Sequence, residues 1–156
     1  MKKLTILITA FLAFNLSFAQ DDVSEEIALM QELFGVEKAS IMEQNIDLTG
    51  VNSDAFWKLY DEYEKQRQEL GKARMELLQK YTNKKGALTN QQAKDLMAEA
   101  VPLRTAGDKL ILNYTKRIEK ATNALVSVQF YQIENYISDG IRFSILNNID
   151  FIQDKK

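Results

Sequence analysis

The sequence predicts an all-α fold, an elongated antiparallel helical hairpin with short flanking helices. Two heptad-like runs of large side chains predict the arms of this hairpin, over residues 53–80 and 89–123. A polar segment that ends in Gly86 separates the runs and has the composition of a loop between helices. At about 1.5 Å per residue, the arms are about 42 and 52 Å long. A compact domain of this size has a radius of gyration of about 14 Å, so the predicted shape is elongated.

An N-terminal leader precedes the predicted domain. Residues 1–19 combine a basic start, a short apolar run and small residues up to Ala19, the pattern of a secretory signal peptide cleaved after that residue. A retained membrane anchor is the alternative, but the apolar run is shorter than the about 20 residues that a spanning helix needs. We therefore expect a single domain over residues 20–156.

Composition excludes several classes of function. The chain contains no cysteine and no histidine, which removes disulfides, thiolate sites, Ser-His-Asp triads and the commonest zinc or copper ligation. Loss of Lys2 and Lys3 with the leader leaves 18 basic against 22 acidic residues, so the formal net charge moves from −2 to −4. This balance does not favour nucleic acid or an anionic membrane as the main partner. Asp61 and Glu64 could be proposed as a carboxylate dyad, but no cleft-forming pattern accompanies them. We expect no enzyme activity, cofactor, metal site or small-molecule substrate.

The N-terminal half of the domain has local helix signals. Ser24 is a candidate N-cap for a helix over residues 24–34, and a second short helical stretch follows over residues 39–46. The first arm begins after Asn52. Large side chains recur every three or four residues along one face of this arm, which we call its seam, and the first of them are aromatic. The seam consists of Phe56, Tyr60, Tyr63, Arg67, Leu70, Arg74, Leu77 and Tyr81.

The second arm contains Pro102, the only proline of the chain. A proline inside a helix removes one backbone hydrogen bond and costs about 3 kcal/mol. The apolar seam stays in phase across it, so we predict one kinked helix rather than two. This seam consists of Leu96, Ala100, Leu103, Gly107, Leu110, Tyr114, Arg117 and Ala121.

A third helix is expected over residues 125–147. The alternation of Ile141, Phe143 and Ile145 would also suit a strand, but the sequence offers no partner strand, so a continuous helix is favoured. Residues 149–152 are expected to form an apolar tail that folds back, ahead of a solvated C-terminus.

The three long helices are expected to begin with one recurring phrase. In each copy a leucine would dock outside the helix, a hydroxyl would cap it where one is present, and an amide in the first turn would hydrogen-bond the loop backbone. The copies are Leu48-Thr49-x-x-Asn52, Leu88-Thr89-x-x-Gln92 and Leu125-Val126-x-x-Gln129.

With the leader and the helical pattern, these phrases resemble the L-T-x-x-Q signature of the Spy/CpxP family of Gram-negative periplasmic proteins. The resemblance spans roughly residues 48–137, with Asn52 in place of glutamine in the first copy and Val126 in place of threonine in the last. It implies a thin, cradle-like helical homodimer in the periplasm, an ATP-independent chaperone or envelope-stress protein. Metal-responsive members of the family use histidine, which this chain lacks. Residues 56–64 also resemble uncharacterised secreted helical proteins of similar length, a resemblance that implies no function.

Aromatic and basic residues on the helices are candidates for binding. Amphipathic rings suit an adaptable apolar surface, although packing of these rings against one another in the core is the favoured alternative. Arginines beside the seams could flank a groove, although such side chains more often cover apolar surface and pair with carboxylates. The candidate client-binding or partner-binding residues are Phe56, Trp57, Tyr60, Tyr63, Arg67, Arg74 and Tyr131.

Two functions follow as expectations. The first is a periplasmic homodimer that holds unfolding or partly folded proteins on an exposed apolar groove, without ATP. The alternative is a non-chaperone adaptor or envelope sensor that binds one specific protein partner through the same surface.

Overall fold

The computed structural model describes residues 37–82, 87–147 and 153–154. The expected leader over residues 1–19, the helix expected over residues 24–34 and the tail expected over residues 149–152 lie outside these ranges.

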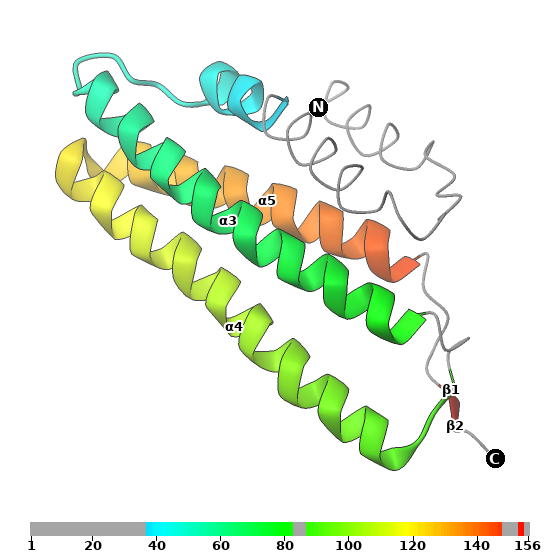
Figure 1. The fold of residues 1–156 in the computed structure, drawn as a ribbon. Coiled ribbons are helices and arrows are strands. Elements are labelled where there is room, and N and C mark those ends of the chain that lie inside the picture. Colours follow the sequence, from blue (N-terminus) through cyan, green and yellow to red (C-terminus); the bar gives the residue numbers. More distant parts are fainter. Residues whose placement is uncertain (1–36, 83–86, 148–152, 155–156) are drawn as a thin grey trace.

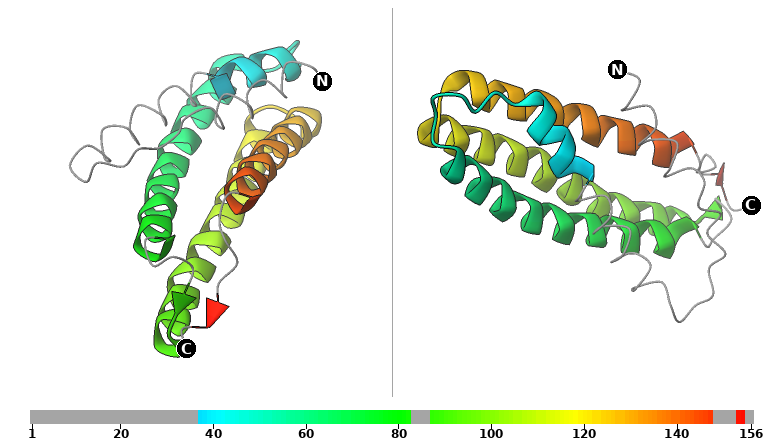
Figure 2. Two further views of the ribbon diagram at one scale, coloured as in Figure 1. Left: turned by 90° about the vertical axis from the view of Figure 1, so that its right-hand side faces the viewer. Right: turned by 90° about the horizontal axis from the view of Figure 1, so that it is seen from above.

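Three long helices dominate the described fold, α3 (Ser53–Thr82), α4 (Asn90–Ala121) and α5 (Ala124–Asn147). Figures 1 and 2 show them as three rods side by side, with α4 diverging from the others toward its N-terminal end. The all-α fold is confirmed, and α3 and α4 are the two predicted arms. The hairpin is not flanked by short helices alone, because α5 has 24 residues and a length of about 36 Å. It packs back along α4, so the fold is a hairpin with a third long helix laid against it.

The helix boundaries agree with the expected ranges within a few residues. The helix expected over residues 39–46 is present over residues 37–45 and lies against α3 and α5 (Figure 2). α4 continues through Pro102 as one helix, as predicted, and α5 ends at Asn147.

Two short strands, which the sequence did not predict, pair beside the start of α4. β1 (Ala87–Leu88) and β2 (Gln153–Asp154) form a parallel pair, with Ala87 opposite Gln153 and Leu88 opposite Asp154. The end of the chain is therefore tied to the residues that lead into α4, where a solvated C-terminus was expected.

The recurring phrase predicts two hydroxyl caps, at Thr49 and Thr89, and only the one at Thr89 is present. Thr89 caps α4 as expected: its hydroxyl accepts from the Gln92 amide at 3.2 Å, and the Gln92 side chain accepts from the Thr89 amide at 3.0 Å. Leu88 is buried beside this capping box. The reciprocal bonds satisfy two of the free N–H groups at the helix start.

Asparagine caps the other two helices, in place of the predicted Thr49 at the start of α3 and where no hydroxyl cap was predicted for α5. Asn52 Oδ1 accepts from the Ala55 amide at 3.0 Å before α3, and Asn123 Oδ1 accepts from the Val126 amide at 2.9 Å before α5. The Thr49 hydroxyl is therefore not a cap, and Thr49 instead donates its amide to Asp47 Oδ1 at 2.9 Å.

The leucine and amide of the last phrase also differ from expectation. Leu125 is exposed rather than docked. Gln129 does reach a loop backbone, since its Oε1 accepts from the Asp47 amide at 3.3 Å. Leu48 packs partly buried against the core, as the phrase predicts.

The buried core gathers at the end where α3 begins and α4 ends. Rings from the three helices meet edge to face, with the Tyr63 ring centre 5.2 Å from that of Phe130 on α5 and 5.5 Å from that of Tyr114 on α4. On α4 the buried residues are confined to its C-terminal third, so the seam from Leu96 to Gly107 is only partly covered. The core residues are Met42, Ile46, Phe56, Tyr60, Tyr63, Ile111, Tyr114, Ile118, Val126 and Phe130.

Candidate functional site

The outer face of α5 carries a row of exposed apolar side chains. At about 100° per residue these positions fall within an arc of about 80°, on the side of α5 opposite its buried residues. Phe143 is the most exposed, at 73%. Tyr131, one of the candidate binding residues, lies beside the row and is also exposed. We call this row the α5 stripe: Leu125, Val128, Tyr136, Phe143 and Leu146.

Charge is nearly absent from α5. Its sequence contains three charged residues, Glu134, Asp139 and Arg142. Glu134 is fully buried, and Arg142 pairs with Asp139 at 2.9 Å on the helix surface. Asp139 lies within the same arc, between Tyr136 and Phe143, so one exposed carboxylate, paired with Arg142, interrupts the row. Exposed apolar and aromatic side chains with so little charge among them have the composition of an interface core.

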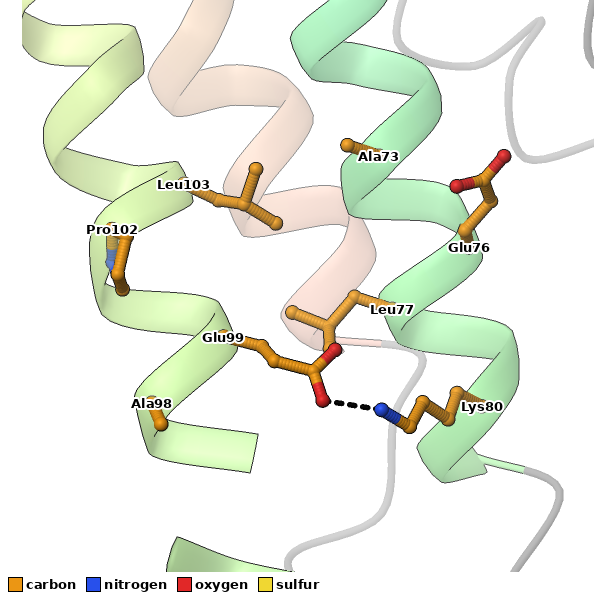
Figure 3. Close-up of a pocket in the computed structure, with 8 residues that line it drawn as sticks. All are labelled: Ala73, Glu76, Leu77, Lys80, Ala98, Glu99, Pro102 and Leu103. Carbon is orange, nitrogen blue, oxygen red and sulfur yellow. Dashed lines mark hydrogen bonds and ion pairs between the residues drawn. The ribbon is translucent and has the colours of Figure 1, made fainter. Parts of the chain in front are cut away.

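A cleft lies between the C-terminal half of α3 and the N-terminal half of α4, where the two helices diverge (Figure 3). Its volume is about 530 Å³. Lys80 on α3 pairs with Glu99 on α4 across it, and the hydrogen bond that Lys80 donates to Glu99 raises the pKa of Lys80 above its usual value. The other residues that line the cleft are Ala73, Glu76, Leu77, Ala98, Pro102 and Leu103.

Three of the candidate binding rings lie in the core. Phe56, Tyr60 and Tyr63 are each 2% exposed or less, so they cannot reach a partner in this conformation. The alternative of core packing therefore describes them better than an exposed binding patch. Trp57 is half-buried and packs edge-on against Phe56 at 5.1 Å.

Most of the arginines beside the helix seams pair with carboxylates, which was the favoured alternative to a role in binding. Arg67 Nε lies 3.0 Å from Glu64 on the same helix, and Arg117 Nη2 on α4 lies 2.5 Å from Glu62 on α3. Arg67 is therefore held by a carboxylate rather than free to flank a groove.

Arg74 differs from these arginines. Among the described residues no carboxylate lies within ion-pair distance of it, and its Nη2 donates to the Leu103 carbonyl on α4 at 3.2 Å. Burial lowers the pKa of Arg74, and the neighbouring Arg142 lowers it further. The guanidinium lies over Gly107, where a Cβ atom would be 2.1 Å from Nη2. The guanidinium of Arg74 therefore occupies the space that a side chain at position 107 would take.

A buried ionic cluster, which sequence reasoning missed, joins three helices. Lys38 Nζ lies 2.6 Å from Glu64 Oε1 on α3 and 2.8 Å from Glu134 Oε2 on α5, and Lys38 is 1% exposed. The Tyr63 hydroxyl donates to the same Glu134 oxygen at 2.6 Å. One sequence signal pointed to this cluster, because Glu134 falls among the apolar positions of the last helix.

The cluster perturbs the tyrosines beside it. Burial raises the pKa of Tyr63 well above its usual value, and the negative charge of Glu134 raises it further. Burial likewise raises the pKa of Tyr60, followed by the charge of Glu64. Both tyrosines are therefore held neutral in the folded chain.

No helix in residues 37–82 or 87–147 is long and apolar enough to cross a membrane. Nor do three or more acidic side chains gather there in a way that could hold a metal ion. Comparison with family models, with curated proteins and with solved structures gives no match to this chain.

Proposed function

We propose that this protein is an ATP-independent chaperone of the periplasm that holds unfolding proteins on the α5 stripe. The observation that carries the proposal is the stripe itself: five large apolar side chains are exposed on one face of α5, where the exposed charges are limited to the ion pair of Asp139 with Arg142. The resemblance to the Spy/CpxP family, the expected cleavage after Ala19 and the expected homodimer belong to the same proposal.

The dimensions of the stripe suit an extended segment of an unfolding chain. From Leu125 to Leu146 the helix rises about 32 Å, which an extended segment of about ten residues spans at about 3.3 Å per residue. Covering each half-exposed stripe residue gains about 1–2 kcal/mol before the costs of ordering the client. Binding is therefore expected to be weak and reversible, which suits a holdase that releases its clients without ATP.

Light scattering from unrelated denatured proteins tests the proposal. The chain, at equal molar amounts, is expected to suppress the aggregation of two or three model proteins of different fold. Replacement of Tyr136 and Phe143 together by serine should weaken suppression of all of them. Leu112→Ser is the matched control, because Leu112 is exposed on α4 outside the stripe. Circular dichroism must show that both variants keep their helical content.

The alternative of a dedicated adaptor predicts a different outcome of the same experiment. An adaptor would leave the aggregation of every model protein unchanged and would bind one protein tightly through the stripe. Sedimentation of the wild-type chain and the Phe143→Ser variant decides whether a second copy occupies the stripe. A dimer that the variant abolishes would place the stripe in the dimer interface and contradict its proposed role in holding clients.

A further inference from the structure

Residues 37–46, which we call the cover segment, close the core over the first turns of α3 and the start of α5. Met42 is fully buried and Ile46 nearly so, and both belong to the same cluster as Phe56 and Phe130. Figure 2 shows this short helix lying across the two longer ones. The cover segment therefore supplies part of the surface that keeps the α3 rings out of water.

An ionic anchor holds the cover segment to both helices. Lys38 reaches Glu64 on α3 and Glu134 on α5 with the same Nζ atom, which also lies 5.2 Å above the centre of the Tyr63 ring. These partners are 26 and 96 residues away in sequence. One side chain thus links a segment of ten residues to two separate helices.

The anchor is well suited to release. Breaking it returns Lys38 and its partners to water, and this recovered hydration offsets much of the lost attraction between the charges. Glu64 keeps Arg67 at 3.0 Å, and Glu134 Oε2 keeps the Tyr63 hydroxyl, so each carboxylate retains one partner. Glu134 Oε1 has no partner among the described residues even when the anchor is closed, and opening would give it access to water. An apolar contact of equal area would regain no hydration of charged groups when it opened.

The connection between the cover segment and α3 is suited to act as a hinge. Asp47, Thr49 and Gly50 are exposed, and Gly50 has a φ of +73°, a left-handed conformation that glycine adopts without strain. One hydrogen bond among the described residues, donated by the Asp47 amide to Gln129 Oε1, ties this connection to α5, and Leu48 packs partly buried against the core. Rotation about a few residues here would lift the cover segment without disturbing α3.

We infer that the cover segment is a releasable, autoinhibitory cover, closed by Lys38, over a second apolar surface formed by Phe56, Tyr60 and Phe130. Release exposes these rings for unfolding protein segments in addition to the α5 stripe. The inference rests on the proposed function for its biological meaning, but opening of the cover is measurable without it.

Hydrogen exchange of the full chain, followed by mass spectrometry, tests the opening. In the wild type, amides of residues 37–46 are expected to exchange before those of the α4 core, because a local opening exposes them. Lys38→Ala should accelerate exchange in the cover segment at least about tenfold and leave the amides around Ile118 unchanged. Ile118→Ala is the matched control: it removes a fully buried side chain of α4 and should accelerate exchange throughout the core. Ile46→Ala loosens the same cover without removing a charge and serves if Lys38→Ala does not fold.

Dye binding and aggregation assays then separate the cover from the proposed function. The open variant should bind more of an apolar fluorescent dye and suppress aggregation more strongly than the wild type. Increased dye binding with no suppression by any form would support the cover and overturn the holdase. Two outcomes would overturn the inference. In the first, the cover segment exchanges in step with α4 in the wild type and in both cover variants. In the second, the cover segment opens but dye binding does not increase.

Discussion

Replacement of Gly107 by alanine probes how closely α3 approaches α4. An alanine Cβ would lie 2.1 Å from Arg74 Nη2 and 3.3 Å from its Cζ, far inside contact distance. The end of a flexible side chain can move away, but the guanidinium then loses its bond to the Leu103 carbonyl. We therefore expect the glycine and the arginine to be energetically coupled.

Two opposing contributions set the size of the effect. Alanine is favoured over glycine inside a helix by about 1 kcal/mol. A hydrogen bond from a charged donor is worth about 1.5–3 kcal/mol, and a bond of 3.2 Å from a partly exposed arginine lies at or below the lower end of that range. Gly107→Ala alone should therefore leave stability within about 0.5 kcal/mol of the wild type. In an Arg74→Ala background, the same change should stabilise the chain by about 1 kcal/mol.

Urea unfolding of the four proteins, followed by circular dichroism, measures this coupling. The expected interaction energy is about 1 kcal/mol, well above the about 0.3–0.5 kcal/mol of scatter seen for independent sites. Stabilisation by Gly107→Ala to the same extent in both backgrounds would refute the close packing of Arg74 on Gly107.

Three further predictions concern the helix starts and the buried tyrosines. Thr89→Ala and Asn123→Ala each remove an N-cap and should each lower the free energy of unfolding by about 1 kcal/mol, whereas Asn123→Ser should cost little in the same urea titration. The pKa values of Tyr60 and Tyr63 are raised, so the folded chain keeps two protons that the unfolded chain loses above about pH 10. The free energy of unfolding is therefore unaffected by these groups below that pH. Above it, the free energy of unfolding falls by about 1.4 kcal/mol per pH unit for each tyrosine. Tyrosinate absorbance should rise together with the loss of helical signal in alkaline titration. Tyr60→Phe should make the alkaline loss of stability less steep. It should cost little stability at neutral pH, because the Tyr60 hydroxyl has no partner among the described residues. Tyrosinate absorbance that rises before unfolding would contradict the burial of these hydroxyls.

The helices could be predicted from sequence because their signals are local. Steps of three and four mark both arms, and the seam that runs in phase across Pro102 correctly indicates one continuous helix. The caps were harder to predict. The recurring phrase pointed to Thr49 and offered no hydroxyl cap for the last helix, whereas the chain enters those helices through Asn52 and Asn123. Asparagine is as good a cap as threonine, so the choice depends on the backbone path into each helix.

The role of the aromatic residues could not be decided from one sequence. Phe56 and Tyr60 have the composition of either a core or a binding surface. Their burial depends on Met42 and Ile46, which a separate helix brings over them. The period of a helix identifies its apolar face but not the element that covers it.

The Lys38 cluster was beyond sequence reasoning for a related reason. Its partners lie 26 and 96 residues away, and nothing in a helical pattern indicates which lysine meets which carboxylate. Glu134 was the one visible signal, because it occupies a position where the periodicity of α5 places apolar residues. A charge at such a position indicates a buried partner without identifying it.

The central claim, that unfolding protein is held on the outer face of α5, is tested most directly by photo-crosslinking. A photoactivatable phenylalanine analogue at Phe143 is compared with the same group at Lys58, an exposed position on α3. With a denatured model protein present, the claim predicts crosslinks to that protein from position 143 and only background from position 58. Equal yields from the two positions, or no crosslink from position 143 under conditions where aggregation is suppressed, would contradict it.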